Sequence, residues 1–250
     1  MTVHFVGAGP GAADLITLRA AAMLAAADVV LYPGTYIDAA VLSHCRDDAD
    51  LVDTQELDLD RITAVMVEAH AADRDVVRLT SGDPSLYSAL HEQTRRLDAA
   101  GVPWDVTPGV PAYAAAAAIV GRELTVPLVA QSVVLTRAQA RSTAMPETEA
   151  LSRFAATRAT LALHLEITRT RELMGELERE YGADCPVVVV HRASQPEELV
   201  LRGSVADIAD QVEAAGLRQA AVILVGRALD PSGGGESFLY DPARDRSGSA

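Results

Sequence analysis

The sequence is poor in cysteine and in aromatic side chains. Its 250 residues include two cysteines, and aromatic residues make up 4% of the chain. Cys45 and Cys185 have neither CxxC nor Cys/His metal-ligand spacing, so the pattern excludes a disulfide framework and predicts two small buried hydrophobic residues. The six histidines are widely scattered along the sequence, so we expect no metal site.

A long apolar run and an excess of positive charge are also missing. No stretch approaches the roughly 20 apolar residues that a membrane helix needs, and the N-terminus runs into a strand pattern without a basic leader. The 21 basic residues against 35 acidic ones give a formal charge of −14, which repels phosphate backbones and anionic lipids. We therefore expect a cytoplasmic protein whose partners are neither nucleic acids nor membranes.

Strand and helix patterns alternate in the first half of the chain. Hydrophobic residues make up 49% of the sequence, which is enough to build a buried core. Such alternation is typical of a mostly parallel α/β sheet. The periodicity predicts strands at 3–6, 29–32, 51–52, 76–79 and 104–106, with helices at 18–27, 39–45, 60–73 and 86–100.

A second α/β pattern follows an alanine-rich helix predicted at 111–121. We therefore expect two α/β domains with mostly parallel sheets, at 1–121 and 122–231, and a disordered glycine-rich tail at 232–250. The second set has strands at 133–136, 161–165, 187–191 and 221–225, with helices at 147–157, 169–181 and 205–215.

The glycine-rich loop GAGPG of residues 7–11 directly follows the first predicted strand. Glycine lets the backbone come close to a ligand, so the position suits a binding loop. The dinucleotide fingerprint GxGxxG, however, requires glycine where Ala12 stands, and Pro10 lacks the N–H that a phosphate cradle uses. Taken alone, the loop fits a ligand site and a structural turn equally well.

Two later loops also follow predicted strands. In SGDPSLY (81–87), Asp83 can accept hydrogen bonds from a ribose or an amine, or it can cap a helix that begins with Pro84. The segment TPGVPA (107–112) is a stiff turn that suits either a ligand loop or an interdomain hinge. Because open α/β sheets bind ligands at the carboxyl ends of their strands, one cleft can be built from all three loops.

Several separated motifs resemble one family in the same order. VGAGPGAADLITLRA, LTSGDPSLYSAL, TPGVPAYAAAAA, ELTVPLVAQSVVLTRAQAR, PVVVVHRAS and AAVILVGRALDP together resemble the tetrapyrrole methyltransferases of corrinoid biosynthesis, most closely the group that methylates precorrin-4 at carbon 11. The likeness runs from about Val3 to Pro231. Ordered agreement of several motifs is more specific than any one of them.

The resemblance implies a homodimer of two-domain subunits. Each subunit would bind S-adenosylmethionine in a cleft between its domains, with a tetrapyrrole beside it, and release S-adenosylhomocysteine. This methyl donor has no phosphate, so a proline in the glycine loop is compatible with it. The cofactor-binding positions that the resemblance implies are Pro10, Ser81, Gly82, Asp83, Leu86, Pro111, Ala112, Leu165, Ala193 and Ala221.

A corrin precursor is a polycarboxylate, so an acidic protein needs local positive charge where it binds one. Arginine can bind a carboxylate bidentately. For any single arginine, a solvated position paired with surface carboxylates is an equal alternative. The candidate substrate-binding residues are Arg122, Arg137 and Arg141, together with Gly9 and Gly11 of the glycine loop.

The implied reaction is methylation of precorrin-4 at ring carbon 11, which gives precorrin-5 in cobalamin biosynthesis. An electron-rich ring carbon attacks the methyl on the sulfonium, and alignment of the two reactants supplies most of the rate. No catalytic serine, cysteine or histidine is therefore assigned, and the sequence does not identify the proton acceptor.

Departures from the family pattern bear on the substrate. Pro33 after Tyr32, and Thr54-Gln55 after the third strand, differ from the members that act on uroporphyrinogen. LYPGTY, LTSGDP and HRASQPEEL, which has no tryptophan before its proline, differ from the precorrin-4 group. Cobalt-precorrin-4, or methylation at another corrin position, therefore stays an alternative.

Other function classes fit less well. A nicotinamide-dependent oxidoreductase needs the glycine fingerprint that is broken at Ala12. An RNA or diphthamide-type methyltransferase of the same fold is a more distant alternative, because the acidic surface opposes RNA. A binding module without catalytic activity would not need to bind a methyl donor.

Overall fold

The computed structural model describes residues 1–138, 144–232, 234–238 and 243–244. It divides into two compact units: unit 1 comprises Met1–Ala115 and Arg192–Glu198, and unit 2 comprises Ala116–His191 and Leu199–Ala250. The division falls six residues before the predicted boundary at 121, and it gives residues 192–198 to unit 1 rather than to the second domain. Much of the tail predicted at 232–250 lies outside the described residues.

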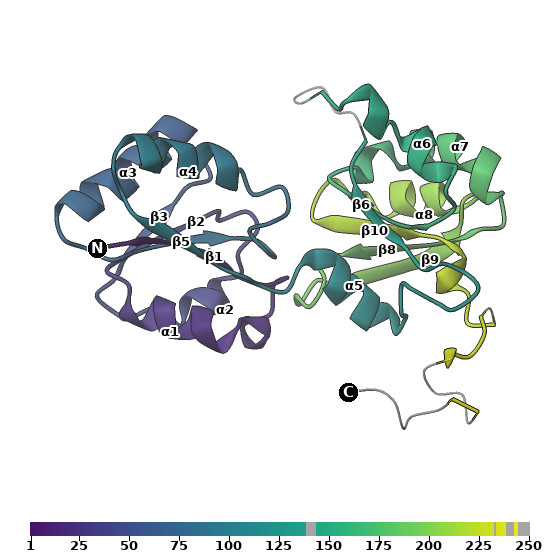
Figure 1. Cartoon of the computed structure of the whole chain (residues 1–250), viewed down its shortest axis with the longest axis horizontal. Coiled ribbons are helices and arrows are strands. Elements are labelled where there is room, and N and C mark those ends of the chain that lie inside the picture. The colour runs from purple at the N-terminus through teal and green to yellow at the C-terminus, as the bar shows by residue number, and fades with distance from the viewer. Residues whose placement is uncertain (139–143, 233, 239–242, 245–250) are drawn as a thin grey trace. The chain divides into compact units, whose positions relative to one another are not determined.

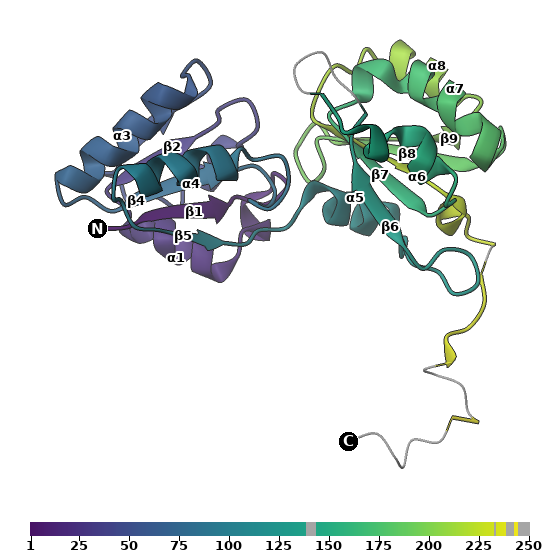
Figure 2. The same ribbon diagram turned by 45° about the horizontal axis from the view of Figure 1, so that its top comes forward.

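Unit 1 is a parallel sheet covered by helices on both faces. Its strand order is β3-β2-β4-β1-β5, and all its neighbouring strands are parallel. Helices α1 and α2 lie on one side of the sheet, and α3 and α4 on the other (Figures 1 and 2). The elements are β1 (Val3–Gly7), α1 (Leu18–Ala26), β2 (Val29–Tyr32), α2 (Ala39–Leu42), β3 (Asp50–Asp53), α3 (Leu59–Ala71), β4 (Val76–Thr80), α4 (Leu90–Ala99) and β5 (Trp104–Thr107).

Local sequence explains where these helices begin. The Thr17 hydroxyl accepts a hydrogen bond of 3.1 Å from the Ala20 N–H at the start of α1, and the Asp58 carboxylate accepts one of 2.8 Å from the Arg61 N–H at the start of α3. Each such cap contributes about 0.5–2 kcal/mol. Strand β1 places Phe5 against the α3 and α4 side and Val6 against the α1 and α2 side, so the sheet is buried on both faces.

Unit 2 is built on a mixed sheet of order β6-β7-β10-β8-β9. Only the β6–β7 pair is parallel, and the other three pairs are antiparallel. Helices α6, α7 and α8 lie on one side of this sheet, and α5 lies on the other (Figure 1). Helix α5 (Ala112–Val120) begins in unit 1 and continues into unit 2 from Ala116. The other elements of unit 2 are β6 (Val133–Thr136), α6 (Leu151–Ala155), β7 (Thr160–His164), α7 (Thr170–Tyr181), β8 (Pro186–His191), β9 (Leu199–Ser204), α8 (Ile208–Ala214) and β10 (Ala221–Val225).

The predicted α/β class and the two sheets are confirmed, and three expectations need correction. The sheet of unit 2 is not mostly parallel. Strand β9 was not predicted, because its residues are exposed or half-buried and carry no apolar alternation. Helix α4 begins at Leu90 rather than at residue 86.

Both cysteines are free. The prediction that they are buried is confirmed for Cys185 and wrong for Cys45, which is half-buried. Within the ranges that the structure describes, no helix has the length and apolar character to cross a membrane.

Unit 2 buries a carboxylate, Glu166, two residues after β7. Its side chain is 1% exposed, and its Oε2 lies 3.3 Å from Nη1 of Arg169. Its Oε1 has no hydrogen-bond partner in the described part of the chain. Burial raises the pKa of Glu166, although the charges of Arg169 and Arg137 and the Ala138 N–H partly oppose the rise. Glu172 also pairs with Arg169. Its side chain is 65% exposed, and hydrogen bonding to Arg169 lowers the pKa of Glu172.

The two glutamates predict opposite pH dependences of stability. A raised pKa means that the folded state binds a proton more tightly than the unfolded state does, so the Glu166 contribution to stability falls as pH rises above the pKa of this carboxyl in the unfolded chain. We expect Glu166→Gln to gain stability relative to the unaltered protein between pH 4 and 7. Glu172→Gln should lose a small amount of stability over the same pH range. The lowered pKa of Glu172 means that its ionised form stabilises the fold at pH values above the pKa of this carboxyl in the unfolded chain. Urea unfolding at several pH values measures both differences, and a pH-independent difference for Glu166→Gln would contradict the assignment.

Candidate functional site

The glycine-rich loop after β1 is hydrogen-bonded to the loop after β4. The Gly9 N–H donates to the Gly82 carbonyl at 3.2 Å, and the Gly82 N–H donates to the Gly9 carbonyl at 2.8 Å. The Ala8 N–H also donates to the Thr80 carbonyl at 2.9 Å. Two of the three predicted loops are therefore joined backbone to backbone.

The third loop approaches the first two so closely that no side chain fits between them. A Cβ on Gly109 would lie 2.8 Å from Cα of Gly7 and closer still to the Gly82 carbonyl oxygen. A Cβ on Gly7 would lie 2.5 Å from the Gly109 nitrogen. Only hydrogen at these Cα atoms is compatible with such contacts. Pro111 and Ala112 also lie against Gly82, with Cα and N, respectively, 3.6 Å from where its Cβ would be.

Asp83 fastens the second loop to the third. Its Oδ2 accepts a hydrogen bond of 2.8 Å from the Gly109 N–H, and its Oδ1 accepts bonds from the Ser85 N–H and hydroxyl. Partial burial by itself raises the pKa of Asp83, but these hydrogen bonds outweigh it and hold the pKa below its ordinary value. The carboxylate is thus ionised near neutral pH. Asp83 does not cap a helix at Pro84, because α4 begins at Leu90 and its cap position is Ala89.

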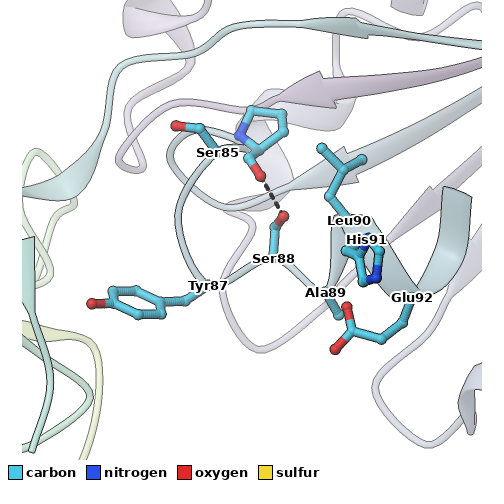
Figure 3. A pocket seen from close by; sticks show the side chains of 8 residues that line it. Ser85, Tyr87, Ser88, Ala89, Leu90, His91 and Glu92 are labelled. Carbon is cyan, nitrogen blue, oxygen red and sulfur yellow. Dashed lines mark hydrogen bonds between the residues drawn. The ribbon is translucent and has the colours of Figure 1, made fainter. Parts of the chain in front are cut away.

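An open cavity of about 390 Å³ follows the Asp83 turn (Figure 3). Its wall is held by the Ser88 hydroxyl, which donates to the Pro84 carbonyl at 2.5 Å. Tyr87 and Ala89 have positive φ angles of 53° and 54°, a backbone conformation that keeps this segment out of the helix. Residues 81–87 were predicted as a candidate ligand loop, but the cavity itself was not predicted. The lining residues are Pro84, Ser85, Tyr87, Ser88, Ala89, Leu90, His91 and Glu92.

Residues 192–198, from a distant part of the sequence, pack on the glycine loop within unit 1. The Ser194 hydroxyl accepts a hydrogen bond of 3.1 Å from the Ala12 N–H, and the Gln195 side-chain amide donates to the Pro10 carbonyl at 3.3 Å. Ala193, which directly precedes Ser194, is buried. Sequence reasoning named Ala193 but missed Ser194 and Gln195, which carry no local signal for this contact.

Eight of the predicted cofactor-binding residues belong to unit 1, and the two others to unit 2. Leu165, with φ of 62°, is 65% exposed just after β7, and Ala221 begins β10. Because Val222 pairs with His164, their neighbours Ala221 and Leu165 lie at the same end of these two strands. The eight in unit 1 are Pro10, Ser81, Gly82, Asp83, Leu86, Pro111, Ala112 and Ala193.

The candidate arginines belong to unit 2. Arg137 directly follows β6, is half-buried and interacts electrostatically with Glu166. The Nε of Arg122 is buried without a hydrogen-bond partner among the described residues. Arg141 lies outside the described residues. Across the described ranges, no three His, Cys, Asp or Glu side chains are grouped so that they could hold a metal ion.

Comparison with known proteins gives matches over most of the chain. Residues 2–209 match the family Tetrapyrrole (Corrin/Porphyrin) Methylases. The chain is 53% identical to a precorrin-4 C(11)-methyltransferase of Rhodococcus erythropolis, over 98% of this chain and 99% of the relative. It is 49% identical to a protein of the same name from Mycobacterium tuberculosis, over 98% of both chains.

Solved structures of methyltransferases with related names have folds similar to the fold of this chain. A cobalt precorrin-4 methyltransferase matches with a TM-score of 0.89 and 38% identity, over 92% of this chain and 96% of that one. Uroporphyrin-III C-methyltransferase from Thermus thermophilus, in complex with S-adenosylhomocysteine, matches with a TM-score of 0.77 and 28% identity, over 92% and 94% of the two chains. Fold, sequence and motif order agree, and the chain belongs to the tetrapyrrole (corrin/porphyrin) methylase family.

Proposed function

We propose that this protein transfers a methyl group from S-adenosylmethionine to ring carbon 11 of precorrin-4, giving precorrin-5 in cobalamin biosynthesis. The observation that carries this proposal is the 53% identity, over nearly the whole of both chains, to a relative named for that reaction. Relatives named for cobalt-precorrin-4 are less similar, at 38% identity, which favours the cobalt-free substrate. The protein would work as a homodimer in the cytoplasm.

The site chemistry of unit 1 suits this donor. S-adenosylmethionine supplies an electrophilic methyl on a positively charged sulfur, and it has no phosphate for a cradle to bind. The loop that contains Pro10 lacks one N–H and has two others bonded within the protein, at Gly9 and Ala12, so it would serve a phosphate poorly. The glycines at 7, 82 and 109 let the three loops pack backbone against backbone, which fixes the position of the loops that would hold the donor.

The chain would act mainly by holding its ligands in place. Asp83 accepts three hydrogen bonds from the protein, so its role is to fix the loops rather than to accept a proton. Alignment of nucleophile, methyl and sulfur in a water-poor site can supply an effective molarity of about 10⁵ M or more. An activated side-chain nucleophile is therefore unnecessary, and we assign none.

Mass spectrometry of the product tests the reaction directly. Incubation with precorrin-4 and isotopically labelled S-adenosylmethionine should add one labelled methyl group to the tetrapyrrole, and fragmentation or NMR should locate it at carbon 11. A parallel incubation with cobalt-precorrin-4 compares the two substrates by kcat/KM. Transfer to another ring carbon, or faster turnover of the cobalt form, would overturn the proposed specificity.

Binding of the methyl donor should depend on the hydrogen bonds that Asp83 accepts. We expect Asp83→Ala to weaken S-adenosylhomocysteine binding by about 1–3 kcal/mol, the scale for loss of hydrogen bonds to a charged group. The reason is that the loops of Gly82 and Gly109 are no longer joined by the bond between the Asp83 carboxylate and the Gly109 N–H. Isothermal titration calorimetry measures the affinity. Asp58→Ala is a matched control, because it removes a carboxylate that accepts a backbone N–H at the start of α3. Both variants should lower Tm, but only Asp83→Ala should change affinity, and equal affinities would reduce Asp83 to a structural role.

Recognition of the tetrapyrrole carboxylates should depend on Arg137 and Arg141. We expect Arg137→Ala and Arg141→Ala to raise KM for precorrin-4 without changing donor affinity. The unaltered protein should also lose apparent substrate affinity as salt rises, because the Debye length is about 10 Å at 0.1 M. Arg171→Ala is the control, because Arg171 is 57% exposed and pairs with Asp210 and Glu213 on the surface of unit 2. KM values that match the control at two ionic strengths would exclude both arginines from the substrate site.

A further inference from the structure

The segment 192–198 is a loop braced by its own contacts. The Gln195 N–H donates to the Arg192 carbonyl and the Glu198 N–H to the Gln195 carbonyl, both at 3.0 Å. The Glu198 carboxylate accepts the Ser194 N–H at 2.7 Å, and Arg192 pairs with Glu197 at 3.1 Å. Such internal bonding fixes the loop conformation, so the side chains that the loop carries are held in defined directions.

Gln195 uses this fixed position to cover Gly11. Its Nε2 donates to the Pro10 carbonyl at 3.3 Å. A Cβ on Gly11 would lie 2.7 Å from that Nε2 and 2.9 Å from the Gln195 Cδ. The side chain therefore fills the space beside Gly11 and holds one end of the Pro10–Gly11 peptide group.

The backbone N–H groups of the glycine loop differ in whether they have a hydrogen-bond partner. The N–H groups of Ala8, Gly9 and Ala12 donate to Thr80, Gly82 and Ser194, and Pro10 has no N–H. The Gly11 N–H has no hydrogen-bond partner among the residues that the structure describes, although Gly11 is buried. Buried N–H groups are nearly always paired, so this donor is left for a ligand or a water molecule.

We propose that Gln195 is a positioning residue, which fixes the Pro10–Gly11 peptide so that the Gly11 N–H points at a carboxylate oxygen of a bound ligand. The peptide group is planar and trans, so its C=O and N–H point in opposite directions. By holding the Pro10 carbonyl, Gln195 directs the Gly11 N–H away from itself. The inference rests on the proposed function, because both the methyl donor and the tetrapyrrole carry carboxylates.

The variant Gln195→Met tests this role. Methionine keeps the length and the cover over Gly11 but cannot donate to the Pro10 carbonyl. We expect one ligand to bind about 3- to 10-fold more weakly, the range for loss of one neutral hydrogen bond, with kcat at saturation changed less. A weaker affinity for S-adenosylhomocysteine by calorimetry would identify the carboxylate as that of the donor. A higher KM for precorrin-4 alone would identify it as a tetrapyrrole carboxylate.

The matched control is Gln211→Met on α8. The Gln211 side chain also donates to a backbone carbonyl, that of Arg202, at 3.0 Å, but within unit 2. This variant should leave affinity and KM unchanged. The proposal is overturned if Gln195→Met matches the control in both quantities, or if its losses follow only a reduced folded fraction in thermal melts. Failure of the proposed function is distinct, because the unaltered protein would then fail to bind S-adenosylhomocysteine at all.

Discussion

The close approach of three backbone segments at Gly7, Gly82 and Gly109 is the constraint on which the site of unit 1 depends. Strands β4, β1 and β5 are neighbours in the sheet, so their carboxyl ends emerge side by side. With a hydrogen atom in place of each side chain, the loops that follow can touch. The paired bonds between Gly9 and Gly82, and the Asp83 carboxylate on the Gly109 N–H, then hold the loops at that distance.

Much of this fold is readable from apolar periodicity, and the failures have physical causes. The strands at 29–32, 133–136 and 221–225 were predicted with their observed bounds. Strand direction was predicted correctly in unit 1 but not in unit 2, because periodicity reports which face is buried and not which neighbour pairs with it. The seven residues that link β8 to β9 are too few for a parallel crossover, so the two strands pair as an antiparallel hairpin.

The candidate site was predicted in its local parts and missed in its long-range ones. Glycine and proline after strands mark the three loops, because these residues allow or impose particular backbone angles. Nothing near Ser194 or Gln195 in the sequence indicates that they meet Ala12 and Pro10, from which they are separated by 182 and 185 residues. Asp83 was expected either to bind a ligand or to cap a helix; it caps no helix at Pro84, and its observed bonds join two loops.

The chain passes between the two units three times, at 115–116, 191–192 and 198–199. Seven residues encoded beyond position 190 therefore complete a unit whose other residues all lie before 116. A gene fragment ending at the first crossing would encode the sheet of unit 1 but not the segment that covers its glycine loop. The two halves of this gene are not interchangeable modules, and recombination between family members would have to exchange both segments of unit 1 together.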